Sequence, residues 1–173
     1  MRMPTIFLSH GAPTVVMQNT PATAFLRSLA TRLPAPKAIL VVSAHWEEAR
    51  PTVGLGADTI HDFYGFPQPL YALRYPAPPA QGVAQRVAAL LKPAHAAVDC
   101  TRGRDHGVWT PLMLAWPKAD IPVVQLSLVG GAPSQARWDR DPNRTQWRKA
   151  PGASASARAF RCRSRHRECD HRV

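Results

Sequence analysis

The sequence predicts an α/β fold, with a mostly parallel central sheet flanked by helices. Three runs of apolar, partly β-branched residues indicate strands, at residues 5–9, 38–44 and 121–129. Runs of this kind are typical of strands that are covered on both faces, as in parallel sheets. Apolar residues at helical spacing separate these runs, at residues 21–33 and 80–92. We therefore expect a single domain in which helices pack on a sheet.

The remaining elements follow from local turn and cap signals. A Thr-Pro pair at residues 20–21 can cap and open the first helix. Residues 50–55 are expected to form a short strand at a sheet edge because the segment contains a proline. Residues 98–100 are expected to form another short strand. The last strand, at residues 121–129, would leave an exposed edge open to homo-oligomerisation or aggregation.

Basic charge is distributed unevenly along the 173 residues. Residues 1–132 hold 11 Lys and Arg against 7 Asp and Glu, whereas residues 133–173 hold 11 against 4. We expect residues 1–130 to form an incomplete domain and residues 131–173 to form a disordered, non-native-looking, Arg-rich tail. Translation of a GC-rich gene out of frame would produce such a tail. The alternative is a nucleic-acid-binding protein that acts through the basic tail.

The sequence also restricts the cellular compartment. Three cysteines are too few and too scattered for a disulfide framework, which favours a reducing environment. No apolar run approaches the ~20 residues that span a bilayer, and the N-terminus lacks a basic region followed by an apolar core. We expect a cytoplasmic protein without a membrane partner.

Two histidines follow expected strands. His10 comes after the first run and His45 after the second. Because ligands in open α/β sheets bind beyond the carboxyl ends of the strands, both imidazoles are expected at the same rim. Two converging histidines are a frequent beginning of a metal site. An aromatic loop at residues 59–67 and a third histidine-bearing loop at residues 104–112, which runs into a short helix, complete the candidate site. A zinc-dependent hydrolase on a similar scaffold is one enzyme class that fits.

Five short motifs occur in a specific order along the chain. They are Ser9-His10-Gly11-Ala12-Pro13, Val42-Ser43-Ala44-His45-Trp46, Thr59-Ile60-His61-Asp62-Phe63-Tyr64-Gly65-Phe66-Pro67, Asp105-His106-Gly107-Val108-Trp109 and Pro122-Val123-Val124-Gln125-Leu126-Ser127. Together they resemble the class III (LigB-type) extradiol ring-cleaving dioxygenases, in particular the DOPA 4,5-dioxygenase-like branch. The resemblance covers residues 3–129, roughly the first half of a full family domain.

The resemblance implies an iron(II) enzyme that cleaves a catechol-type aromatic substrate with O2, with zinc in place of iron in some isolated bacterial relatives. His10 and His45 match two metal ligands. His106 matches a catalytic pocket histidine that contacts the catechol oxygens. Other residues of the motifs are carried over as substrate-binding residues or as residues that orient the histidines: His61, Asp62, Phe63, Tyr64, Asp105 and Trp46.

The sequence departs from the family pattern in one respect. The third metal ligand and the acid–base histidine of the family lie in a Thr-His-Asn-like and a Pro-x-x-His-like segment, and neither segment occurs in this sequence. Losing a metal ligand typically lowers metal occupancy or rate by orders of magnitude. We therefore expect this chain to be inactive or poorly folded.

Overall fold

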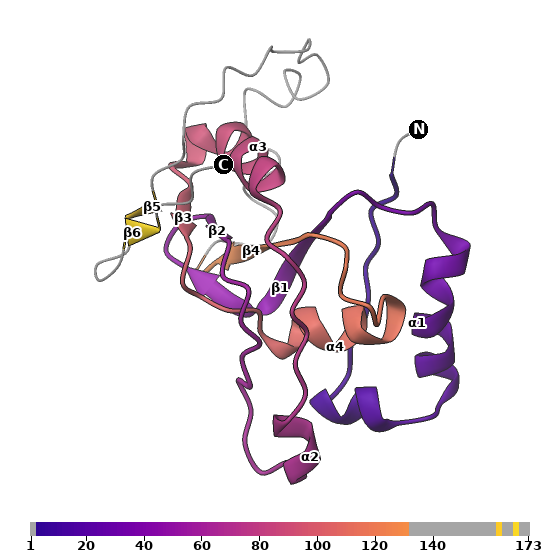
Figure 1. The fold of residues 1–173 in the computed structure, drawn as a ribbon. Coiled ribbons are helices and arrows are strands. Elements are labelled where there is room, and N and C mark those ends of the chain that lie inside the picture. The colour runs from indigo at the N-terminus through magenta and orange to yellow at the C-terminus, as the bar shows by residue number, and fades with distance from the viewer. Residues whose placement is uncertain (1–2, 132–161, 164–167, 170–173) are drawn as a thin grey trace.

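The structure is a computed structural model that describes residues 3–131, 162–163 and 168–169. Its centre is a four-stranded sheet in the order β1-β4-β2-β3 (Figure 1). The strands are β1 (Ile39–Glu48), β2 (Thr52–Gly54), β3 (Ala97–Asp99) and β4 (Val123–Val129). β1 pairs with β4 and β2 pairs with β3 in parallel, whereas β2 meets β4 antiparallel. The predicted α/β class, with a mostly parallel sheet flanked by helices, is confirmed.

Helices cover both faces of this sheet. α3 lies on one face, and α4 and α1 lie on the other (Figure 1). Thr20 caps α1 by accepting a hydrogen bond from the backbone of Thr23, whose hydroxyl in turn accepts from the backbone of Thr20. The helices are α1 (Pro21–Arg32), α2 (Gln68–Tyr71), α3 (Gln81–Leu90) and α4 (His106–Ala115), with 3-10 turns at η1 (Pro13–Met17) and η2 (Lys92–Ala94).

The core consists of layers on the two sides of β4. Successive strand residues point to opposite faces, so Val123 packs with Trp109 of α4 and Val124 packs with Val87 of α3. Both valines are fully buried, and each such side chain contributes roughly 1.5–3 kcal/mol relative to exposure. This packing holds α4, which carries His106, against the sheet.

The first predicted strand is absent. Residues 3–12 have no strand assignment, and Phe7 is 97% exposed. An apolar, β-branched run favours extended backbone, but a strand also needs a partner to complete its hydrogen bonds, and no described strand pairs with this segment. The second run does form β1. We expected this strand to be covered on both faces, but Leu40 and Val42 are exposed, so one face is open.

The predicted sheet edges are also wrong. β2 lies between β4 and β3, and β4 lies between β1 and β2, so the edges of this sheet are β1 and β3. Pro51 precedes β2 and therefore removes no donor from its ladder. The antiparallel pairing of β2 closes the side of Val123–Val129 that the sequence left open.

Little of the chain beyond residue 131 is described. Cys162–Arg163 (β5) and Glu168–Cys169 (β6) form a two-stranded antiparallel pair, where no strand was expected. The expectations of a disordered or nucleic-acid-binding tail otherwise lie outside the described residues. Cys100, after β3, is half-buried and disulfide-bonded, which the cysteine count did not indicate. Within the described part of the chain, no helix combines the length and apolar character needed to cross a membrane.

A buried arginine anchors the loop that leads into α4. Arg104 is 2% exposed, and its guanidinium donates to the backbone carbonyls of Ala57, Ala77, Pro78 and Val123 over 2.5–3.3 Å. Burial lowers the pKa of Arg104 from its ordinary value. These bonds join the loop, the chain after α2 and β4, and so fix where α4 begins.

Replacing this arginine should destabilise the fold. In Arg104→Lys a single ammonium replaces the planar guanidinium fork and cannot reach four carbonyls from one position. We expect a loss on the order of 3 kcal/mol in the free energy of unfolding, measured by urea denaturation. Arg86→Lys, on the exposed side of α3, is the matched control and should lie within about 0.5 kcal/mol of the parent. Equal unfolding midpoints for the two variants would contradict this role of Arg104.

Candidate metal centre

Three histidines from distant parts of the chain converge on one point. His10, His45 and His106 each offer a ring nitrogen, and these nitrogens all lie within 4.8 Å of one another. Nε2 of His10 lies 2.9 Å from Nε2 of His45, and the ring centroids of His45 and His106 are 4.1 Å apart. Two ring nitrogens in such contact can share one proton or face one cation.

Each histidine is placed by a different kind of element. His10 lies in irregular chain just before η1, where Gly11 takes a positive φ of 65° to turn the backbone. His45 lies within β1, three residues before its end and inside a register shift between Val42 and Glu47. His106 is the first residue of α4. The expectation that both His10 and His45 directly follow strands is wrong, although the rings do meet.

A carboxylate from the aromatic loop holds His106. Oδ1 of Asp62 accepts the backbone N–H of His106 at 2.9 Å, and Oδ2 lies 2.9 Å from Nδ1 of the same residue. Nδ1 therefore carries the proton that faces Asp62, which leaves Nε2 with its lone pair available. Burial by itself raises the pKa of Asp62, but the hydrogen bonds from His106 outweigh it and lower the pKa below its ordinary value.

The surroundings of His10 favour its neutral form. Burial lowers the pKa of His10, and the neighbouring His106 and His45 lower it further. Neutral imidazole is the form that binds a metal ion, and nitrogen ligands suit iron and zinc. The donor set of these three residues therefore fits a transition-metal ion.

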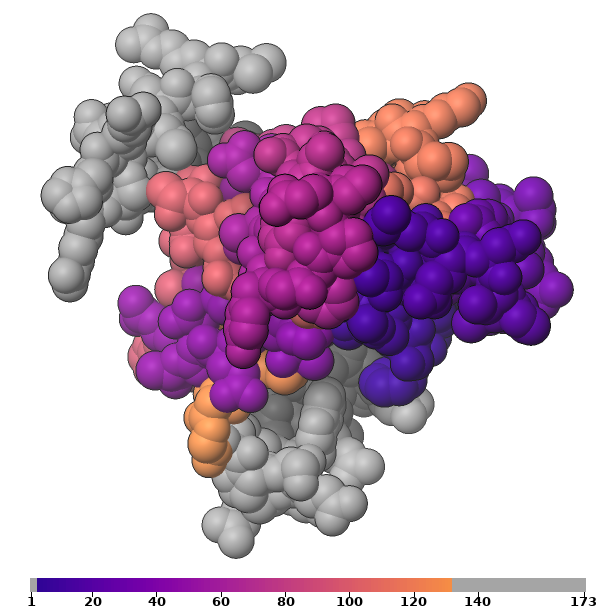
Figure 2. All heavy atoms as spheres, turned by 90° about the horizontal axis from the view of Figure 1, so that it is seen from below, coloured from indigo at the N-terminus to yellow at the C-terminus, as the bar shows by residue number. Residues whose placement is uncertain are grey.

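The other predicted site residues take up different positions. Phe63 approaches His106 edge-on, with ring centroids 5.8 Å apart. Tyr64 is 92% exposed. His61 points towards the backbone of Leu73, with Nε2 3.2 Å from its carbonyl oxygen, and does not join the three clustered rings. Viewed from below, the segment containing α2 lies against η1, near the loop that carries His10 (Figure 2).

Trp46 and Asp105 are both buried beside the cluster. The indole N–H of Trp46 donates to Glu48 at 2.8 Å, and the guanidinium of Arg102 stacks on its ring. Asp105 is fully buried and accepts hydrogen bonds from Ser43 and Gln125. Ser43 and Gln125 have no role in the site predicted from the sequence, although both lie in the family-like motifs. Each is a polar residue inside an otherwise apolar strand, which is the signal that could have indicated them.

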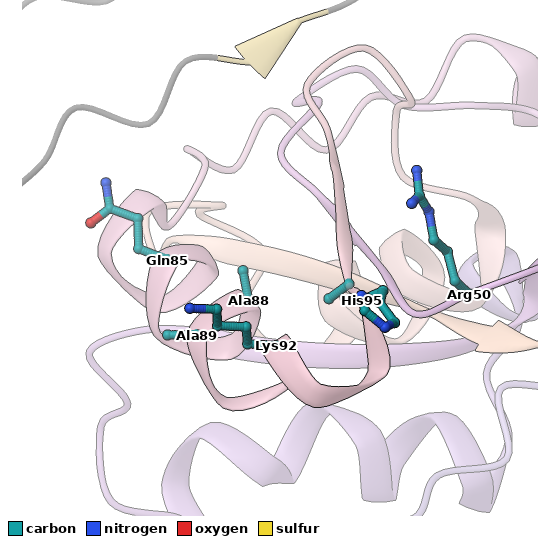
Figure 3. Close-up of a pocket in the computed structure, with 7 residues that line it drawn as sticks. Arg50, Gln85, Ala88, Ala89, Lys92 and His95 are labelled. Atoms are coloured by element: carbon teal, nitrogen blue, oxygen red, sulfur yellow. The ribbon is translucent and has the colours of Figure 1, made fainter.

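A shallow hollow of about 480 Å³ lies elsewhere on the molecule. It is found at the C-terminal end of α3 and contains none of the three clustered histidines. Figure 3 shows its lining, which is Arg50, Gln85, Ala88, Ala89, Lys92, His95 and Ala96.

Comparison with known proteins identifies the family. Residues 4–140 match the family described as the catalytic LigB subunit of aromatic ring-opening dioxygenase. This match, together with the α/β domain and its histidine cluster, identifies the class of protein as an aromatic ring-opening dioxygenase. The chain belongs to the LigB family of these enzymes. Neither the hydrolase nor the nucleic-acid alternative is favoured by these matches.

Curated relatives share this similarity over about half of their own length. The chain is 45% identical to a 4,5-DOPA dioxygenase extradiol of Escherichia coli K12 over 140 residues, which covers 77% of this chain and 50% of the relative. It is 46% identical to the protein of that name from Beta vulgaris over 132 residues, 72% of this chain and 49% of the relative. A dioxygenase of Hapsidospora irregularis, tasH, is 39% identical over 73% of this chain and 44% of its own.

A solved structure has the same fold over the shared part. The crystal structure of an uncharacterized protein from Escherichia coli K12 aligns with a TM-score of 0.55 and 37% sequence identity. The alignment covers 67% of this chain and 43% of that one.

The Asp62–His106 pair should make stability depend on pH. The lowered pKa of Asp62 means that the carboxylate stabilises the fold above its unfolded pKa of about 3.9, and that this contribution disappears as pH falls through the lower folded value. We expect Asp62→Asn to lose about 1–2 kcal/mol at pH 5–7 and progressively less towards pH 2, as measured by urea denaturation. Asp120→Asn, at an exposed carboxylate, is the control. A loss that stays constant down to pH 2 would contradict the assignment.

Proposed function

We propose that His10, His45 and His106 form the active centre of an extradiol dioxygenase, which opens a catechol-type aromatic ring with O2 and uses iron(II). Zinc can occupy the same imidazole site. The observation that carries the proposal is the convergence of three ring nitrogens within 4.8 Å, in a chain of the aromatic ring-opening dioxygenase family.

His10 and His45 are proposed to hold the metal, because their Nε2 atoms face each other at 2.9 Å. When bound, the metal would bring the catechol and O2 together and pass electron density between them. Two neutral imidazoles leave several coordination positions open for these ligands.

His106 is proposed to contact the catechol oxygens and to move a proton. Its Nδ1 is held by Asp62, so its Nε2 is the nitrogen available to accept a proton from the substrate hydroxyl. Asp62 acts by orienting this ring and stabilising its protonated form. Phe63, edge-on to His106, would form an apolar wall for a flat substrate.

We also propose that the isolated 173-residue chain turns over slowly or not at all. Among the described residues, one group of three histidines meets. In this proposal two of them bind the metal and the third binds substrate. The family resemblance implies a further metal ligand and an acid–base histidine, and neither has a counterpart among the described residues. The chain spans about half the length of the curated relatives it matches.

Metal binding tests the roles of His10 and His45. We expect the parent chain to bind one iron(II) or Co²⁺ per molecule, measured anaerobically by calorimetric titration. His10→Ala and His45→Ala should each weaken binding by about 100-fold or more, because each removes a direct ligand. His95→Asn changes an exposed histidine outside the cluster and keeps a side chain that tolerates the left-handed backbone there, so it is the matched control. Equal affinity in all three variants would refute the metal centre.

Oxygen consumption tests the chemistry. With iron(II) and a catechol, we expect the Escherichia coli relative to consume O2 and form a ring-opened product, whereas this chain gives a rate at least ~100-fold lower. Oxygen uptake by this chain at the rate of the relative, abolished by His10→Ala, would refute its proposed low activity. Hydrolysis of an ester substrate without oxygen uptake would favour the hydrolase instead.

A further inference from the structure

A buried carboxylate lies directly beneath the histidine cluster and joins three elements. Asp105 immediately precedes α4, and its side chain has no solvent exposure. Its Oδ1 accepts a hydrogen bond of 2.6 Å from the hydroxyl of Ser43 on β1. Its Oδ2 accepts a hydrogen bond from the amide of Gln125 on β4. The carboxylate therefore ties the start of α4 to two neighbouring strands of the sheet.

This network reaches His45 through its backbone. The hydroxyl oxygen of Ser43 accepts the backbone N–H of His45 at 3.2 Å. Because a backbone N–H can only donate, the hydroxyl proton of Ser43 remains free for Asp105. His45 therefore donates to Ser43, and Ser43 donates to Asp105. The amide of Gln125 donates to the other oxygen of Asp105.

A glycine allows α4 to approach this network closely. A Cβ atom placed on Gly107 would lie 2.9 Å from Cδ2 of the His45 ring, 2.9 Å from Oγ of Ser43 and 3.1 Å from Oδ1 of Asp105. Contacts below 3.0 Å essentially do not occur for real Cβ atoms. Two of these distances lie below that limit, so a side chain at position 107 would displace the imidazole of His45, the hydroxyl of Ser43 or both.

Stability alone is a poor explanation for these buried polar groups. Oε1 of Gln125 and Nε of Arg102 are buried without a hydrogen-bond partner among the described residues. The guanidinium of Arg102 forms an ion pair with Asp105 at 3.6 Å, which is too long for a hydrogen bond. A buried charge in a partly satisfied network costs more than an apolar core of the same shape would. Proteins keep such destabilising groups mainly at functional sites, where the groups hold other side chains in one geometry.

We propose that Ser43, Asp105 and Gln125, together with the side-chain-free position at Gly107, are positioning residues for the metal centre. They hold the ring of His45 against the first turn of α4, so that His45 faces the ion that it would share with His10 and lies beside His106. The proposal rests on the proposed metal-binding function of the cluster and extends it to residues that touch neither metal nor substrate.

The test is a titration of the full chain with Co²⁺, followed by the absorption bands of the bound ion. Gly107→Ala should weaken Co²⁺ binding by about 10–100-fold, the range typical for residues that support metal ligands, and should change the absorption spectrum. Gly82→Ala is a closely matched control: Gly82 is the second residue of the ten-residue helix α3, as Gly107 is of the ten-residue helix α4, and its added Cβ meets nothing within 4 Å. It should bind Co²⁺ like the parent.

The free energy of unfolding of the metal-free variants is measured beside the titration, to separate positioning from general damage. Ser43→Ala provides a second route if Gly107→Ala does not fold, and should lower Co²⁺ affinity about 10-fold with an altered spectrum. Parental affinity and spectrum in a folded Gly107→Ala, or in Ser43→Ala, would overturn the positioning role. Failure of the parent chain to bind Co²⁺ would instead overturn the proposed metal centre itself.

Discussion

The C-terminal half of β1 and the first turn of α4 meet at a distance that leaves no room for a side chain between them. This contact places His45 beside His106, with ring centroids 4.1 Å apart. Gly107 permits the approach, and the Asp105 carboxylate bonded to Ser43 holds it. Close packing makes this contact sensitive to added volume, because a Cβ atom at position 107 would lie 2.9 Å from both the His45 ring and the Ser43 hydroxyl.

Three consecutive residues, the last of which begins α4, make different contacts. Arg104 binds backbone carbonyls and fixes the position of the loop. Asp105 binds Ser43 and Gln125, and so attaches the loop to the sheet. His106 is held by a separate carboxylate and directs its free nitrogen towards the other two histidines. Burying three polar side chains in a row is costly, and each is stabilised by partners from other segments.

The main contribution of the aromatic loop to the site is a carboxylate, that of Asp62. Asp62 accepts both the backbone N–H and the ring N–H of His106, so it satisfies a backbone donor in the first turn of α4 and orients the ring. Phe63 lies beside the same ring, whereas Tyr64 is exposed. The same loop therefore stabilises the start of α4 and sets which ring nitrogen of His106 carries the proton.

The sequence by itself indicated the α/β class, helices close to the observed α1 and α3, and the runs that form β1 to β4, because periodicity and turn residues act locally. The three histidines were identified from the ordered motifs that resemble the family. It could not determine that residues 5–9 have no partner strand in the described part of the chain or that β4 is internal, because pairing depends on which segments compete for each edge. It also could not indicate that Asp62 holds a histidine 44 positions away, or that Gly107 must be bare beside His45. Those contacts exist only once distant segments have packed, so the tertiary structure decided them.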